Sequence, residues 1–492
     1  MNQNNISAAE LFLRVRELLI LPELEPKTRN KMMHDTLILC CHEGVKETKQ
    51  AFGNLFSQVD YLCKAHGIKV ADKIAIQTMR RHSNSQEPLS SEDLKYDARA
   101  LAIFISAVFG VDVPHELNVL IPHTNRPYQK GLEINNRRIR CIVKNWDSDF
   151  IRVDIDQDAD EEEYLVQLKD EENHIDHTYL WDILKEGMQL NLLDCQVKQP
   201  IITPRLIVVE PDYLVDISSI ATCFTAFGHH PLLYLLNLMK PRANTQATLL
   251  GNFAGAALDD IINSHGKYQM NETVKTNFRE KALEFCTCPW FDPKKFYTDA
   301  SLQAFNLQQV VDILFPRTAS QAQMSAFRGE SLYDRKKAIL EPSFVCEALG
   351  IQGRVDLMTT DCKLLVEQKS GRNMNIENHQ VDPGYHSYQL EPHYVQLLLY
   401  YGVLQHNFKL SNDRVNIRLL YSKYRPQDGL MVVAYYQKLF KEAIQYRNQL
   451  VAASFEIAKE GFEHALNEFT PEVLNVAGTQ DFFYNKYLKP QI

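Results

Sequence analysis

Apolar residues recur every three to four positions from Met1 to about Leu117, and this spacing predicts amphipathic helices. Two examples are AELFLRVRELLI, which starts at Ala9, and EGVKETKQAFGNLFSQVDYLCKAHG, which starts at Glu43. A third segment, LSSEDLKYDARALAIFISAVFG, has serines before acidic residues at its start and ends at Gly110, as is typical of helix ends. We therefore expect a helical domain over residues 1–120.

Between about Pro122 and Asp216 the pattern changes to short alternating runs. RRIRCIVKNW, DFIRVDID and EYLVQL are rich in β-branched residues and are separated by polar turns. This texture favours a small β-barrel over residues 121–216, of the OB type or related to it. Such barrels bind single strands through basic and aromatic groups, and the candidates here are Arg137, Arg138, Arg140, Lys144 and Trp146. The alternative, that these groups only solvate the strand faces, stays open.

The rest of the chain contains both the helical spacing and the strand-like alternation of apolar residues. The stretch EPSFVCEALGIQGRVDLMTTDCKLLVEQKSG, from Glu341, predicts two strands at Ile351–Met358 and Lys363–Gln368, joined by the polar turn TTDC. A helical run, EPHYVQLLLYYGVL, and a strand-like run, RVNIRLLYSKY, follow it. This order predicts an α/β core over residues 217–475, with a mixed sheet flanked by helices, a helical insert at about 270–340 and a C-terminal tail at 476–492.

Composition narrows the class of protein. With 492 residues, 45% apolar and 23% charged, the chain is ordinary for a globular protein of about two to four domains. The net charge of -9 means that nucleic acid would need a local basic patch. The ten cysteines lack paired zinc spacing, and no apolar run reaches the length of a membrane span. Without a secretory signal, we expect a cytoplasmic protein that does not contact membranes.

Three charged residues in the two predicted strands suggest chemistry. Glu367 and Lys369 are separated by one residue, so they share a strand face, and pairing of the strands would bring Asp356 beside them. Two carboxylates offer hard oxygen ligands to Mg²⁺ or Mn²⁺, and a neighbouring lysine can orient water or stabilise charge on a phosphate. From these three residues alone, a solvated hairpin face is the favoured interpretation, because charged side chains are mostly exposed.

Further sequence elements favour a catalytic site over a solvated hairpin face. The order G-R-V-D, about ten residues, E-x-K-S-G, and then Gln396 and Tyr400 at helical i, i+4 spacing resembles the PD-(D/E)xK nuclease superfamily in its RecB-type branch. Upstream, LLGNFAGAALDDII resembles the first helix of that family, and RVNIRLLYSKY resembles the strand that follows the Gln–Tyr helix. The stretch is similar in particular to the nuclease domain of the replication and repair helicase–nucleases that process DNA flaps.

The resemblance implies roles for individual residues. Asp356, Glu367 and Lys369 would be catalytic, with Gln396 and Tyr400 positioning the lysine and the DNA. One or two Mg²⁺ or Mn²⁺ ions would be the cofactor.

The implied metal ligands are Asp356, Glu367 and the Gln368 carbonyl, with Glu341 as an additional candidate. Arg354, Arg372 and Lys363 are the expected nucleic-acid contacts.

Two departures from the family pattern limit what is carried over. The place of a histidine on the first helix falls on Gly255, and His265 lies a turn or more beyond it, so that role is assigned to neither residue. Some relatives hold an iron–sulfur cluster through one early and three late cysteines. Cys223 matches the early position, but no cysteine follows Cys362, so no such cluster is expected.

The expected function is therefore that of a metal-dependent DNA nuclease acting on single-stranded or flap DNA in replication, repair or recombination. Two alternatives stay open: a catalytically inactive DNA-binding or scaffold subunit of a helicase–nuclease assembly, and a defence or CRISPR-linked nuclease. The chain has no G-x-x-x-x-G-K-[ST] phosphate loop. Three alternatives for a helicase or ATPase motor therefore stay open: it lies on another chain, it lies in a missing C-terminal region, or there is none.

Overall fold

The computed structural model describes residues 6–21, 24–48, 51–52, 55–84, 88–126, 136–155, 164–170, 174–198, 200–225, 228–239, 244–379, 388–410, 415–461 and 463–464. The predicted tail at 476–492 lies outside the described residues. None of the helices in these ranges combines the length and apolar content needed to cross a membrane.

The described residues of the N-terminal region form helices and one short strand. Its elements are α1 (Ala8–Ile20), α2 (Pro26–Val45), β1 (Ala51–Phe52), α3 (Leu55–Ala65), α4 (Val70–Asn84), α5 (Ser91–Phe109) and α6 (His115–Asn118). Ser90 caps α5 by accepting a hydrogen bond from the Asp93 amide at 3.0 Å, and Gly110 ends the helix in the left-handed conformation. Strand β1 pairs in parallel with a strand near the C-terminus, so this region also supplies an edge strand to the core sheet.

The next region forms a closed barrel. Its strands are β2 (Asn136–Trp146), β3 (Phe150–Ile155), β4 (Tyr164–Gln167), β7 (Gln189–Lys198) and β8 (Ile201–Thr203), accompanied by β5 (Lys169–Asp170), β6 (Ile175–Asp176), η1 (Thr178–Asp182) and β9 (Leu206–Val209). The five main strands pair in the order β2-β3-β4-β8-β7, and β7 pairs again with β2. Alternate residues such as Cys141, Val143 and Ile151 fill the interior. A small closed barrel is therefore present where the alternating runs predicted one.

The C-terminal half of the chain alternates helices and strands. Its first part contains β10 (Val215–Asp216), α7 (Ile217–Ala221), β11 (Phe224–Thr225), β12 (Gly228–His229), α8 (Leu232–Met239), α9 (Gln246–Asn263), α10 (Met270–Glu280), α11 (Ala282–Cys286), α12 (Pro293–Leu314), α13 (Ala319–Phe327) and η2 (Arg335–Lys337). Its second part contains β13 (Ala338–Leu340), β14 (Ser343–Cys346), β15 (Ile351–Arg354), β16 (Leu357–Thr359), β17 (Leu364–Lys369), α14 (Met374–Glu377), α15 (Glu391–Phe408), β18 (Asn416–Tyr421), α16 (Pro426–Gly429), β19 (Leu430–Val433) and α17 (Gln437–Glu460).

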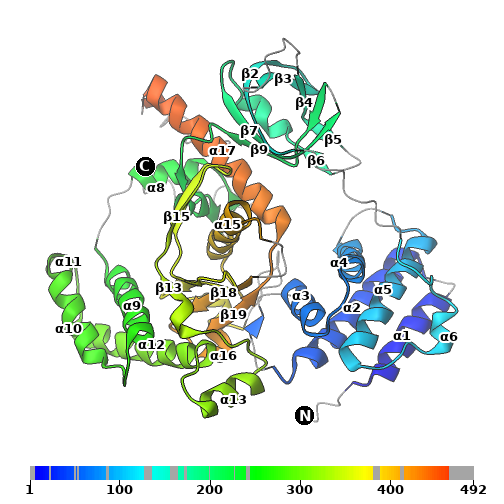
Figure 1. Ribbon diagram of the computed structural model, residues 1–492, viewed down its shortest axis with the longest axis horizontal. Helices are drawn as coiled ribbons and strands as arrows, with labels where there is room; N and C mark the ends of the chain where they lie inside the picture. The colour runs from blue at the N-terminus through cyan, green and yellow to red at the C-terminus, as the bar shows by residue number, and fades with distance from the viewer. Residues whose placement is uncertain are drawn as a thin grey trace.

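These strands build a mixed six-stranded sheet in the order β1-β19-β18-β17-β16-β13. The neighbours β17 and β18 run parallel, and α15 makes the crossover between them. Helices α7, α15 and α17 pack on one face and α9 and α12 on the other, while α17 also runs beside the barrel (Figure 1). Both faces of β17 are therefore covered, which explains its nearly continuous apolar run.

The hairpin that the sequence predicts is present, but its first strand is not continuous. β16 and β17 pair antiparallel, with Leu357 opposite Val366. The predicted strand Ile351–Met358 divides into β15, which belongs to a three-stranded sheet with β10 and β14, and β16. The break falls at Asp356, whose carbonyl accepts a hydrogen bond from the Glu341 amide at 2.9 Å. Glu341 has a φ of 49°, a conformation that is uncommon outside glycine and often found at functional sites.

A half-buried histidine links β12 to two helices of the core. His229 contacts Glu391 of α15 and Glu442 of α17, each at 2.7 Å. Burial alone would lower the pKa of His229, but hydrogen bonds and the charges of the two glutamates outweigh it and raise the pKa to about 9. The folded protein therefore holds this proton more tightly than the unfolded chain does.

We predict that His229 stabilises the fold below about pH 6.5 and that this contribution, at most about 3 kcal/mol, is lost as pH rises through about 9. His229→Gln should therefore lower the free energy of unfolding at about pH 6 and have little effect at about pH 10. Denaturant titrations of both proteins at the two pH values measure this difference. An equal effect of the substitution at both values would contradict the assignment.

Candidate active site

Period-two alternation along β17 divides its side chains between the two faces of the sheet. Leu364 and Val366 pack against the α9–α12 side, whereas Leu365 packs against the α15 side. Glu367 and Lys369 therefore face α15. Lys369 Nζ donates hydrogen bonds to Glu367 Oε1 at 2.7 Å and to Gln396 Oε1 of α15 at 2.8 Å.

Asp356 approaches the same strand from the break between β15 and β16. Its Oδ2 accepts a hydrogen bond from the Gln368 main-chain amide at 2.5 Å. In a strand, the amide and carbonyl of one residue point to the same side, so the Gln368 carbonyl also points toward Asp356. The Gln368 side chain turns the other way and donates to Ser422 Oγ at 2.7 Å. The Gln368 side chain therefore points away from the site, and the main-chain carbonyl is the atom of Gln368 that could bind a metal ion there.

Tyr400 connects the helix to the strand that leads into Asp356. Its hydroxyl donates to the Arg354 carbonyl at 2.6 Å and also interacts with Gln396, one turn earlier on α15. The tyrosine ring lies against Gly353, where an added Cβ would be 2.9 Å from a ring carbon. The sequence G-R-V-D thus places a glycine where the aromatic ring needs the space.

Glu367 is buried, and Asp356 beside it is half-buried. Glu367 is only 2% exposed. Its burial, followed by the negative charge of Asp356, raises the pKa of Glu367 to about 8 although Lys369 opposes this shift. Burial also raises the pKa of Asp356. Two neighbouring acids with raised pKa values are typical of a functional site.

A further carboxylate, Asp259 of α9, was not singled out by the sequence reasoning. Its burial and the negative charges of Glu341, Asp260 and Asp356 raise the pKa of Asp259 to about 7. A signal for it existed in the sequence, because Asp259 lies one helical turn after Gly255, the place matched to the family histidine. We call Asp259, Glu341, Asp356 and Glu367 the carboxylate site.

We predict that Asp259→Asn stabilises the metal-free protein by about 1–2 kcal/mol at neutral pH, because it removes one of the mutually repelling charges. Denaturant titration in EDTA measures the effect. Asp260→Asn is the matched control, since Asp260 is the exposed neighbour that accepts a hydrogen bond from Thr273. A loss of stability in Asp259→Asn, or a larger gain in the control, would contradict electrostatic crowding at this position.

The donor set suits a hard divalent cation. Glu367 Oε2 is buried and has no hydrogen-bond partner, and an unsatisfied buried carboxylate oxygen is costly unless a cation completes it. Asp356 and the Gln368 carbonyl add oxygen ligands of the kind that Mg²⁺ and Mn²⁺ prefer. Within the described ranges, however, no three acidic, histidine or cysteine side chains converge closely enough to hold a metal ion by themselves. The residues therefore fit a cation that draws on a main-chain oxygen and on water as well as on side chains.

The three expected nucleic-acid contacts lie in different places in the structure. Arg354 is 60% exposed and pairs with Glu341 at 2.9 Å, at the rim of the carboxylate site. Lys363 stands just before β17, at the end opposite Lys369, and six residue steps correspond to about 20 Å along a strand. Lys363, expected as a nucleic-acid contact, therefore lies apart from Glu367 and Lys369, because residues at opposite ends of a strand are separated in space. Arg372 follows Lys369 and pairs with Glu377.

Other candidates from the sequence lie apart from this arrangement. In the barrel, Arg138, Arg140 and Lys144 each pair with a carboxylate, and the side chain of Arg137 lies outside the described residues. His265 is exposed beyond the end of α9. Cys223 is fully buried, and burial raises the pKa of its thiol.

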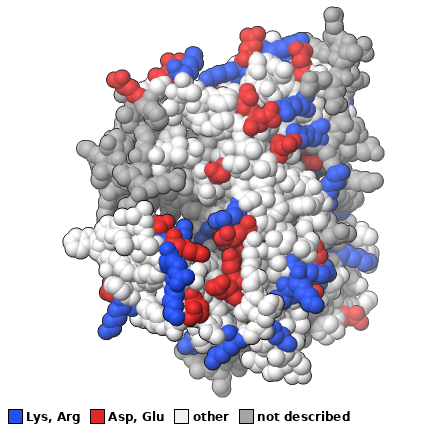
Figure 2. Space-filling view, turned by 60° about the vertical axis from the view of Figure 1, so that its left-hand side comes forward, with Lys and Arg blue, Asp and Glu red and all other residues white. Residues whose placement is uncertain are grey.

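Figure 2 shows a hollowed face of the molecule with acidic and basic side chains gathered around the hollow. A comparison with protein-family models finds no match to this chain, and a comparison with curated protein sequences finds none either.

Proposed function

We propose that this protein is a metal-dependent nuclease that hydrolyses phosphodiester bonds in DNA, with single-stranded or flap DNA as the substrate. One observation carries the proposal. Asp356, Glu367 and Lys369 lie together around the buried Glu367 carboxylate, and Lys369 is held between Glu367 and Gln396 at 2.7 and 2.8 Å. An ammonium held beside two acids, one of which has an unpartnered oxygen, is suited to acting on a phosphate with a divalent cation.

Each residue has a distinct task under this proposal. Glu367, Asp356 and the Gln368 carbonyl hold the cation, which supplies positive charge to the phosphate oxygens and makes water easier to deprotonate. The Lys369 ammonium stabilises the negative charge that develops on the phosphate during hydrolysis. Gln396 orients Lys369, and Tyr400 fixes the strand that presents Asp356.

The test is cleavage of end-labelled single-stranded and flap DNA with Mg²⁺ or Mn²⁺, compared with the same reactions in EDTA. The proposal predicts products that depend on the metal ion. Absence of products from both substrates with either metal would contradict it. Binding of DNA without cleavage would support the alternative of an inactive DNA-binding or scaffold subunit.

A further inference from the structure

A second charged cluster lies at the edge of the sheet where β17 and β18 both end. These strands are parallel neighbours, with Lys369 opposite Tyr421, so the loops that follow them leave from the same edge. Arg372 lies in the first loop, and Lys423 and Tyr424 lie in the second. In open α/β sheets, ligands bind outside the carboxyl ends of the strands, which is where these residues are placed.

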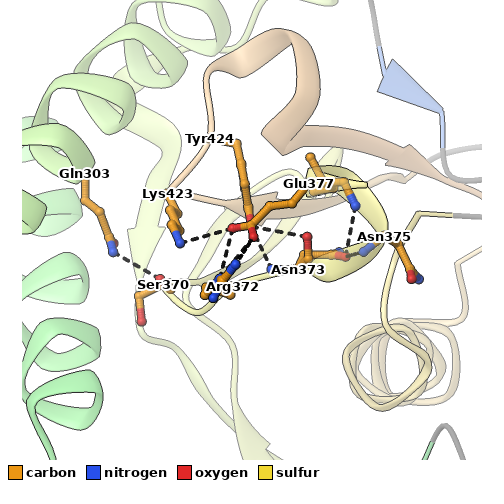
Figure 3. Close-up of polar contacts among 9 residues, drawn as sticks. Gln303, Ser370, Arg372, Asn373, Asn375, Glu377, Lys423 and Tyr424 are labelled. Atoms are coloured by element: carbon orange, nitrogen blue, oxygen red, sulfur yellow. Dashed lines mark hydrogen bonds and ion pairs between the residues drawn. The ribbon is translucent and has the colours of Figure 1, made fainter. Parts of the chain in front are cut away.

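Three side chains of this edge converge on Glu377 of α14 (Figure 3). Arg372 Nε donates to Glu377 Oε2 at 3.0 Å, and a second guanidinium nitrogen contacts the same oxygen. Lys423 Nζ and the Tyr424 hydroxyl donate to Glu377 Oε1 at 3.1 and 2.8 Å. Hydrogen bonds from Arg372, Tyr424 and Lys423 lower the pKa of Glu377 to about 2.

The loops that carry these groups are held in place by the core beneath them. Gln303 of α12 donates to the Ser370 carbonyl at 3.0 Å, between Lys369 and Arg372. The Asn373 amide donates to the Tyr424 hydroxyl at 2.7 Å, which joins the two loops. The loop positions of Arg372 and Lys423 are therefore set by the fold, while their side chains remain 64% and 33% exposed.

We propose that Arg372 and Lys423 form a phosphate-binding subsite for the strand being cleaved, and that Glu377 holds these two cations until a phosphate takes its place. This inference rests on the proposed nuclease function and names a contact of the same substrate beyond the scissile phosphate. Two cations and a hydroxyl around one carboxylate present donors that a phosphate group can accept equally well.

Two features favour such an exchange. The cations of both ion pairs are accessible from solvent, so a phosphate, which carries more negative charge than one carboxylate, can compete with Glu377 for Arg372 and Lys423. Arg372 follows Lys369 by three residues, which places its backbone at most about 10 Å from that of Lys369. A strand with one phosphate at Lys369 can therefore reach this subsite with another phosphate of the same chain.

Binding of a fluorescein-labelled single-stranded oligonucleotide, measured by anisotropy in EDTA at several salt concentrations, tests the subsite. We expect the double variant Arg372→Gln, Lys423→Gln to bind about tenfold more weakly, and the slope of log affinity against log salt to fall by about 0.7 for each lost contact. Glu377→Gln should bind about two- to tenfold more tightly, because the competing carboxylate is gone. A purely structural role of Glu377 would not give tighter binding.

Lys459→Gln is the matched control, since Lys459 is an exposed cation paired with Glu460 at the end of α17. Thermal unfolding of every variant verifies the fold. If the wild-type protein binds or cleaves the oligonucleotide, and the double variant and Glu377→Gln do so equally well, the subsite alone is overturned. A wild-type protein that neither binds nor cleaves would overturn the nuclease proposal together with the subsite.

Discussion

Replacing Lys369 by alanine should lower the single-turnover rate of DNA cleavage by about 10²- to 10³-fold, the usual effect of removing one charge-stabilising donor from an active site. The reason is geometric. Lys369 is the cation whose ammonium is held by Glu367 and Gln396, so it is already placed when the phosphate arrives. The fold should survive, because the Lys369 side chain is still partly exposed.

Lys363→Ala is the matched control for this experiment. It removes the same charge from the residue just before β17, which is exposed and lies at the end of the strand opposite Lys369. Rates within about threefold of wild type are expected for Lys363→Ala, since surface substitutions away from a site have small effects. Equal losses in both variants would show that the chain's general charge, rather than the site geometry, governs cleavage.

The largest effect on stability should come from Arg447→Ala, with a loss of about 3–5 kcal/mol in the free energy of unfolding. Arg447 is fully buried in α17. It donates to four main-chain carbonyls, those of Val209, Glu210, Tyr213 and Gly350, which come from the end of the barrel and from the turn before β15. Alanine removes this donor from all four carbonyls, of which those of Val209 and Gly350 belong to buried residues, and leaves a cavity between the barrel and the sheet.

Denaturant titration followed by circular dichroism measures this loss, with Arg138→Ala as the control because Arg138 lies on the barrel surface. Gly350 provides a second variant. It has a φ of 60°, and an added Cβ would lie 2.3 Å from an Arg447 nitrogen, so Gly350→Ala should also destabilise the protein. A loss of less than about 1 kcal/mol in Arg447→Ala would contradict its role at the junction.

Local periodicity explains why part of the site could be predicted. The shared face of Glu367 and Lys369 follows from alternation along a strand, and the proximity of Gln396 and Tyr400 follows from the helical period. These are properties of short segments, which hold whatever surrounds them.

Contacts between distant segments explain what could not be predicted. Asp356 reaches β17 only because the chain changes sheets at that residue, and Asp259 joins the carboxylate site through the packing of α9. The two-residue strand β1 is too short for any periodicity, so its pairing with β19 gives no signal in sequence. The same holds for Arg447, whose carbonyl partners lie far from it along the chain.

The most direct test of the proposed site compares Mn²⁺-dependent cleavage of end-labelled single-stranded DNA by the wild-type protein and by Glu367→Gln. Glutamine keeps the volume of the buried side chain and removes only the charge that would hold the cation. The account predicts metal-dependent products from the wild type and none from a folded Glu367→Gln. Cleavage by Glu367→Gln at the wild-type rate would contradict the assignment of this site.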